Sequence, residues 1–286
     1  MENTTPFFII SSGRSGTQMM AKIFDSFQNI EMHHEYMVNI IQPISTQYYM
    51  GMISKKIVCE ELVKTYKNSI YYSEKEVWGD SSNKLSWIIE CLNEVFPDAK
   101  FIHLVRDGRK VVSSFYNKLS DECYDDKSVK ILNNWINQPE KYPKPPPEKK
   151  FWWNIPIKKE EEKLNFEKYN QFERICFHWK EVNSNILKNL EKIPENRKRF
   201  YKLEDLVSDS KFLKNLLEFL NLEFDETKFE LLKKPYNVNI PKDFQLDDKQ
   251  KDEFFKIAGS MMKTLGYNSK KEYSLNYNGD NSIKFN

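Results

Sequence analysis

The sequence predicts an α/β fold in which helices flank a central parallel sheet. Residues 7–10 form a short apolar run that stops at Ser11, as a strand buried on both faces does. After Gly16 the apolar residues recur at helical spacing. Residues 101–105 form a second apolar run, and a helical segment again follows it after Asp107. Two strand-to-helix turns of this kind favour parallel strands with helices packed on the sheet.

The rest of the chain alternates helical and extended segments. Apolar spacing predicts helices over residues 85–96, 172–190, 212–220 and 247–266 and a strand over 199–203. The pattern breaks between residues 120 and 170, where six prolines exclude a long helix through the middle. We interpret this segment, which is rich in tryptophan and lysine, as an insertion or lid within a single domain of residues 1–286.

The overall composition excludes several classes of protein. A formal net charge of +2 gives no argument for nucleic-acid binding. Four widely spaced cysteines without a CxxC pair favour reduced thiols over a zinc site or a disulfide framework. The first six residues lack the basic residues of a signal peptide, and no apolar run approaches the ~18 residues of a membrane span. We expect a cytoplasmic protein without a membrane span; its oligomeric state stays open.

The loop after the first strand has the composition of an anion site. Backbone N–H groups of a first helical turn are unpaired and, with the helix dipole, attract anions. Glycines allow a phosphate to approach closely, while arginine and hydroxyl groups add donors. The candidate binding residues are Ser12, Gly13, Arg14, Ser15, Gly16, Thr17 and Gln18. Because the loop lacks the Gly-Lys-Ser/Thr of a Walker A motif, we expect no metal ion; the alternative is a polar turn that binds nothing.

A second basic site follows the strand at 101–105. Arg106 lies at the carboxyl end of that strand, where ligands gather in parallel α/β sheets. Ser114 follows eight residues later, so a turn between them can aim both at one phosphate, and Asp107 can cap the next helix or orient an arginine. The alternative is a surface ion-pair cluster. One ligand with two separated anionic groups would explain both basic sites.

These motifs resemble those of the sulfotransferases that use 3′-phosphoadenosine 5′-phosphosulfate (PAPS). Residues 8–20 resemble the family's 5′-phosphosulfate loop, and residues 96–109 with Ser114 resemble its 3′-phosphate site. Residues 201–206 and the closing segment 257–267, which ends in Leu-Gly-Tyr, look like two later family motifs. The resemblance covers most of the chain except 120–170 and implies a P-loop-type core.

The resemblance also assigns donor-binding residues. Arg14 to Thr17 would grip the 5′-phosphosulfate, and Arg106 and Ser114 would hold the 3′-phosphate. Tyr201 belongs to the later strand motif. Similar enzymes close a basic segment over the 3′-phosphate near Lys233 and Lys234, although surface lysines are the alternative here.

The implied reaction is transfer of the PAPS sulfuryl group to an acceptor hydroxyl or amine, with 3′-phosphoadenosine 5′-phosphate (PAP) as product. In-line attack requires positioning, charge stabilisation and a general base. His33, His34 and Glu35 lie 19 to 21 residues after Arg14. Members resembling the tyrosylprotein and glycan sulfotransferases carry a glutamate base in this region. Glu35 is therefore the first candidate, with a pKa expected to be raised near a polyanionic donor; His34 is the second and His33 a weaker one, and a solvated loop acid is the alternative for Glu35.

One position departs from the family pattern. Many relatives carry a lysine that assists the leaving group where this chain has Ser81. Lys84, three residues later, is the candidate replacement; otherwise Arg14 alone would stabilise the leaving charge.

The acceptor is undetermined by sequence. The tryptophans and lysines of 120–170 suit a flat-faced, anionic acceptor such as a sugar chain, or else the aromatic residues pack a small core. A glycan, a peptide tyrosine or a small molecule are all compatible. Two other functions remain open: a non-catalytic PAPS- or PAP-binding protein, and a nucleotide kinase or NTPase that uses the same loop.

Overall fold

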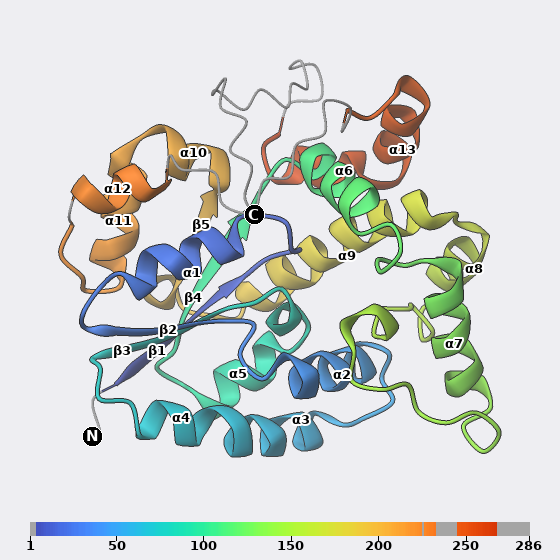
Figure 1. Ribbon diagram of the computed structural model, residues 1–286, viewed down its shortest axis with the longest axis horizontal. Helices are drawn as coiled ribbons and strands as arrows, with labels where there is room; N and C mark the ends of the chain where they lie inside the picture. The colour runs from blue at the N-terminus through green and yellow to red at the C-terminus, as the bar shows by residue number, and fades with distance from the viewer. Residues whose placement is uncertain (1–3, 225, 233–244, 268–286) are drawn as a thin grey trace.

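Five parallel strands form the central sheet of the computed structural model, which describes residues 4–224, 226–232 and 245–267 (Figure 1). The strand order across the sheet is β2 (Ile30–His34), β3 (Val77–Ser81), β1 (Thr5–Ile10), β4 (Lys100–Val105) and β5 (Lys198–Lys202). The predicted α/β class with a parallel sheet is confirmed. β1, β4 and β5 lie where the apolar runs predicted strands, whereas β2 and β3 were not foreseen.

Helices cover both faces of the sheet, and their bounds follow the predicted segments closely where a prediction existed. The helices in chain order are α1 (Thr17–Asp25), α2 (Val38–Tyr49), α3 (Lys55–Leu62), η1 (Val63–Lys67), α4 (Asn68–Tyr71), η2 (Lys84–Trp87), α5 (Ile89–Val95), α6 (Gly108–Lys118), α7 (Asp126–Asn137), η3 (Lys149–Phe151), α8 (Glu160–Lys168), α9 (Gln171–Leu190), η4 (Glu195–Arg197), α10 (Leu203–Ser208), α11 (Ser210–Phe219), α12 (Glu226–Leu232) and α13 (Asp248–Thr264).

The central strand β1 is apolar throughout because both of its faces are covered. Side chains alternate between the two faces of a strand. Phe8 and Ile10 pack with α3, α5 and α9, while Phe7 and Ile9 pack with α1, α11 and α12. All four side chains are fully buried. A third apolar cluster joins α6, α7, α9 and α13 beyond the carboxyl ends of the strands.

The segment 120–170 packs into this third cluster. Its tryptophans Trp135, Trp152 and Trp153 are at most 9% exposed and share the cluster with Trp179 and Phe254. The aromatic side chains therefore build a core. The interpretation that they present flat faces to an acceptor is wrong for these three tryptophans.

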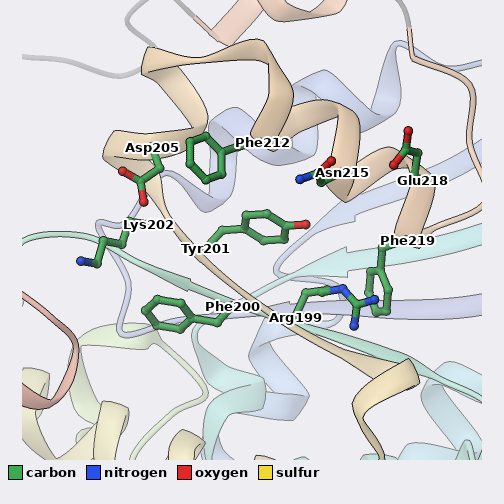
Figure 2. A pocket seen from close by; sticks show the side chains of 9 residues that line it. All are labelled: Arg199, Phe200, Tyr201, Lys202, Asp205, Phe212, Asn215, Glu218 and Phe219. Atoms are coloured by element: carbon green, nitrogen blue, oxygen red, sulfur yellow. The ribbon is translucent and has the colours of Figure 1, made fainter.

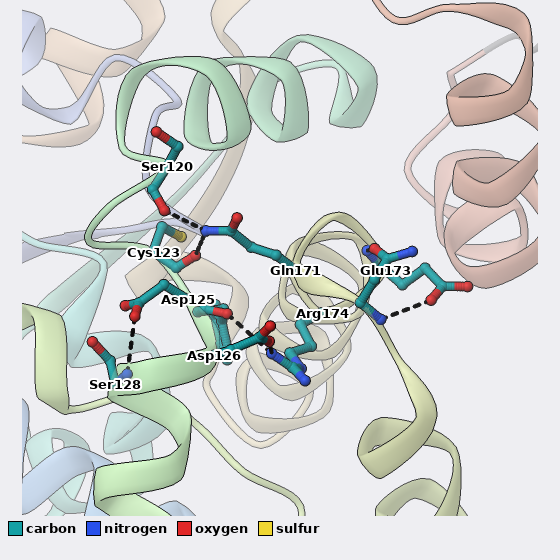
Figure 3. A network of polar contacts seen from close by, with 10 residues as sticks. Ser120, Cys123, Asp125, Asp126, Ser128, Gln171, Glu173 and Arg174 are labelled. Atoms are coloured by element: carbon teal, nitrogen blue, oxygen red, sulfur yellow. Dashed lines mark hydrogen bonds and ion pairs between the residues drawn. The ribbon is translucent and has the colours of Figure 1, made fainter.

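Polar contacts fasten the start of this segment to α9 (Figure 3). The Gln171 side-chain amide donates to the Ser120 and Cys123 carbonyls at 2.5 and 2.8 Å. The Arg174 guanidinium donates to the Asp126 carboxylate at 2.6 Å. Because α9 also packs against the sheet, these contacts fix the segment relative to the strand ends.

Parallel pairing brings the loops after four strands to one edge of the sheet. Ser81 is the register partner of both Ile9 and His34, and Ile10 pairs with His103 on β4. The chain therefore leaves β1, β2, β3 and β4 at the same edge, where the predicted site residues follow. Within the described residues, no helix is long and apolar enough to cross a membrane.

The burial of Trp152 gives a test of this packing. We expect Trp152→Ala to lower the free energy of unfolding by about 3–5 kcal/mol, because it leaves a large cavity in a close-packed core. Phe200→Ala, at a ring that is 44% exposed, should cost less than about 1 kcal/mol. Denaturant unfolding followed by circular dichroism measures both. Equal small effects would mean that the 120–170 segment is not part of the folded core.

Candidate active site

The loop between β1 and α1 has an unusual backbone. Gly13, Arg14 and Gly16 adopt positive φ values of 83°, 53° and 90°. A Cβ atom on Gly13 would lie 2.8 Å from the Asn83 amide nitrogen and 2.9 Å from the Phe115 ring, so only glycine fits there. Gly16 caps α1 without a side-chain hydrogen bond, which leaves backbone N–H groups of the first turn available to a ligand. The loop thus has the geometry of an anion site.

The two predicted basic sites meet at Arg14. The Arg14 Nε donates to Ser114 Oγ at 2.9 Å, and Arg106 Nη1 donates to the Arg14 carbonyl at 3.1 Å. One of these side chains follows β1 and the other two follow β4. Arg109 is not part of this group, because its guanidinium forms a buried 2.6 Å ion pair with Asp107, which also caps α6.

The candidate base lies after β2 at the same sheet edge. Glu35 and Met37 have positive φ values of 56° and 49°, so the turn that carries the carboxylate is a strained one. The Glu35 carboxylate is paired with the Lys149 ammonium of η3. His34 contacts the anion loop, because its Nε2 lies 3.3 Å from Thr17 Oγ1.

His33 points elsewhere. It lies 2.9 Å from the Glu31 carboxylate, and its ring packs 4.8 Å from the Trp78 ring. The structure therefore brings His34 and Glu35 together and leaves His33 in a separate cluster.

Lys84 begins η2 and is only 8% exposed. Burial lowers its pKa to about 8, against the opposing charge of Glu35. Its ammonium lies 5.3 Å from the centre of the Trp153 ring. Ser81, at the place of the family lysine, donates its hydroxyl proton to the Thr17 carbonyl at 2.9 Å. Lys84 thus places a cation near Glu35, while Ser81 supports the anion loop.

The cations decide the ionisation of Glu35. Burial acts to raise the pKa of this carboxyl, but Lys84 and Lys149 outweigh it, and the pKa lies below the ordinary value. The raised pKa was expected for Glu35 beside a bound polyanionic donor; in the protein alone the pKa is lowered, because two lysines converge on this side chain. Glu35 is therefore a carboxylate at neutral pH.

Sequence reasoning missed a buried histidine beneath the loop. His178 of α9 lies with its Nε2 3.1 Å from the Ser12 carbonyl and its Nδ1 3.0 Å from the Tyr124 hydroxyl. Burial, with the charge of Lys84, lowers the pKa of His178 to about 3, so the ring is neutral. A neutral ring that donates to Ser12 must accept from Tyr124. On a long amphipathic helix a single histidine gives no signal of this role.

Among the remaining predicted binding residues, the structure places Gln18 and Tyr201. Gln18 is exposed in the first turn of α1. Tyr201 lies on the edge strand β5, where it lines a cavity of about 580 Å³ together with Arg199 and Phe219 (Figure 2). Lys233 and Lys234 lie outside the described residues. Among the described residues, no group of three or more His, Cys, Asp or Glu side chains could hold a metal ion.

Comparison with known proteins finds similarity to sulfotransferases. Residues 6–142 match the sequence model described as the sulfotransferase family. The sulfotransferase domain from the curacin biosynthetic pathway is similar in structure, with a TM-score of 0.52 and 16% identity over 93% of this chain and 98% of that one. A search of curated protein sequences found no match.

Two further solved structures are also similar. The sulfotransferase from Alicyclobacillus acidocaldarius has a TM-score of 0.53 at 11% identity, covering 92% of this chain and 96% of that one. The sulfotransferase domain of the Synechococcus PCC 7002 olefin synthase has a TM-score of 0.50 at 18% identity, covering 91% and 96%. At these identities the structural likeness supports the fold.

The contact between His178 and Ser12 predicts a role in anion binding. We expect His178→Ala to weaken PAP binding about fivefold to tenfold, because it leaves the Ser12 carbonyl without its donor and loosens the loop. His103→Ala is the matched control, since that ring is equally buried but contacts Asn183 instead. Calorimetric titration with PAP measures both variants. Equal losses of PAP affinity would show that the effect is general destabilisation.

Proposed function

We propose that the chain is a sulfotransferase that transfers the sulfuryl group of PAPS to a hydroxyl or amine of an acceptor, a proposal that the match of residues 6–142 to the sulfotransferase family model supports. The observation that carries the proposal is the contact of Arg14 with both Ser114 and Arg106. It joins two basic sites from different strands, as a donor with a 5′-phosphosulfate and a 3′-phosphate requires. A single-phosphate ligand would leave one of them unused.

The donor would be held by the loop and by the second basic site. In this proposal residues 12–18 surround the 5′-phosphosulfate with backbone N–H groups and hydroxyls. Arg106 and Ser114 take the 3′-phosphate, and Arg14 turns from Ser114 to the sulfuryl end. Tyr201, Lys233 and Lys234 remain proposed contacts that rest on the family resemblance alone. The donor set needs no metal ion.

Glu35 is the proposed general base. Its lowered pKa keeps it ionised at neutral pH, so the carboxylate has no proton and can accept one. The acceptor oxygen attacks sulfur, its proton passes to Glu35, and the bond from sulfur to the 5′-phosphate oxygen breaks to release PAP. Lys84 and Arg14 stabilise the negative charge that grows on the leaving phosphate. His34 is the second candidate for the base, and its contact with Thr17 also suits an orienting role.

The acceptor enters from the side of Glu35. Lys149, whose side chain is half exposed, pairs with Glu35 and must move when an acceptor hydroxyl approaches. An anionic group on the acceptor would offer Lys149 a new partner, so we favour an anionic acceptor; glycan, peptide and small-molecule classes all include one. The segment 120–170, which carries Lys149, is the proposed lid of a single domain. Four free thiols suit a reducing compartment, and we propose a cytoplasmic location on that ground.

Donor binding gives the first test. We expect PAP to bind tightly without Mg²⁺, with at least a tenfold loss in Arg106→Ala, because a charge-assisted contact to the 3′-phosphate disappears. ATP should bind weakly with or without Mg²⁺. Arg199→Ala, on the edge strand β5, is the control and should bind PAP normally. Calorimetric titration that shows ATP binding only with Mg²⁺ and none of PAP would identify a nucleoside triphosphate enzyme instead.

The buried lysine gives the second test. We expect Lys84→Ala to lower kcat about 100-fold or more, because a cation at the leaving group is lost. Since Lys84 is charged only below its pKa of about 8, kcat/KM should fall as the pH rises through this value. Lys84→Arg keeps its charge and should not show this fall.

Turnover of PAPS by Lys84→Ala, Lys84→Arg and an exposed control, Lys211→Ala, measures these effects. Turnover in Lys84→Ala equal to that of the control would remove Lys84 from the mechanism and leave Arg14 as the cation at the leaving group.

A further inference from the structure

A second carboxylate lies directly behind the candidate base, and the mechanism above does not use it. Asp80 of β3 is 0% exposed. Its Oδ2 accepts from the Tyr66 hydroxyl at 2.7 Å, and its Oδ1 accepts from the Tyr36 backbone N–H at 3.2 Å. Burying a carboxyl group costs free energy unless it accepts hydrogen bonds, so these two contacts are what allows Asp80 to lie in the core.

The contacts of Asp80 fall on the strained turn that carries Glu35. Glu35 and Met37, on either side of Tyr36, both have positive φ. L-residues hold this conformation only where the surroundings impose it. Tyr36 is held from both sides, because its N–H donates to Asp80 and its carbonyl lies 3.2 Å from the Tyr66 hydroxyl. The Glu35 N–H donates to the Ser81 carbonyl at 3.3 Å.

We propose that Asp80 and Tyr66 are positioning residues for Glu35: together they hold the turn that aims the Glu35 carboxylate at the attacking oxygen of the acceptor. This inference rests on the proposed function for the role of Glu35. The contacts of Asp80 and Tyr66 with the turn do not depend on that function. Tyr66 comes from η1, Asp80 from β3 and the turn from the end of β2, so three separate elements meet at this point.

The same contacts make the site sensitive to the ionisation of Asp80. Burial raises the pKa of Asp80 to about 7, although the Tyr66 hydroxyl and the Tyr36 N–H favour its charged form and Glu35 opposes it. The groups that face the Asp80 carboxyl are Tyr66 from η1 and Tyr36 and Glu35 from the turn. The register partners of Asp80 in the sheet are His33 on β2 and the apolar Phe8 on β1.

The sign of the pH effect follows from the charge. Ionised Asp80 places a negative charge near Glu35, which raises the proton affinity of Glu35 and makes it a stronger base. Protonated Asp80 removes that charge and lets the acid donate to the Tyr66 oxygen, so that the Tyr66 proton turns to the Tyr36 carbonyl. We therefore expect kcat/KM to rise as the pH increases through about 7.

The hydroxyl of Tyr66 provides the first experiment. Tyr66→Phe should lower kcat about 10- to 100-fold through a misplaced Glu35, with PAP affinity unchanged. Tyr48→Phe is the matched control, because it also removes a hydroxyl that donates to a carboxylate, that of Glu90, away from the turn. A Tyr66→Phe enzyme that turns over PAPS as fast as Tyr48→Phe would overturn the proposal.

Asp80→Asn provides the second experiment, because the amide keeps the size and an acceptor for the Tyr36 N–H but cannot ionise. The rise of kcat/KM near pH 7 should disappear in this variant. In ¹⁵N-labelled protein, the Tyr36 amide resonance should shift as the wild type passes about pH 7 and stay constant in Asp80→Asn.

The two measurements separate the possible failures. A wild type that binds PAP but sulfates no acceptor would overturn the proposed function, while the amide titration still decides whether Asp80 holds the turn. The inference would be overturned, even in an active enzyme, if the Tyr36 amide resonance did not shift near pH 7 in the wild type or shifted equally in Asp80→Asn.

Discussion

The parallel register of the sheet is the constraint on which the rest of the site depends. β1 pairs with β3 on one side and β4 on the other, and β2 pairs with β3. Parallel strands end at the same edge, so the anion loop, Lys84, Glu35 and Arg106 are neighbours although they are far apart in sequence. A one-residue slip of β3 would turn its side chains to the opposite faces of the sheet and separate Asp80 from the turn after β2.

Charge balance is the second condition on this edge. Arg14, Arg106 and Lys84 are cations that the fold brings together in partly or fully buried positions. Burying cations is unfavourable unless partners compensate. Asp107 neutralises Arg109, and Glu35 faces Lys84 and Lys149. The loop backbone adds partial positive charge at the same edge of the sheet.

Sequence alone predicted what depends on local pattern. Apolar periodicity placed β1, β4 and β5 and the long helices, and the loop composition placed Arg14 and its neighbours. β2 and β3 escaped notice because Val77–Ser81 contains Gly79 and polar Asp80 and Ser81, and lacks an apolar run. Polar groups can occupy a buried strand end where tertiary contacts such as the Tyr66 hydroxyl satisfy them, and these contacts are not written in local sequence.

The role of the 120–170 segment shows the same limit in the opposite direction. Its composition left open whether the tryptophans face an acceptor or pack a core; the rings fill a core, and one lysine pairs with Glu35. Gln42 of α2 donates to the carbonyls of Lys149 and Trp152 at 3.0 and 2.8 Å, so the backbone that carries the lysine is held by the same contacts that seat the tryptophan. Packing and charge are therefore coupled here: the rings fix the place from which Lys149 reaches Glu35. A segment that looks like an addition to the fold thus contributes to the ionisation of the candidate base, because the charge of Lys149 acts with that of Lys84 against the burial that would raise the pKa of Glu35.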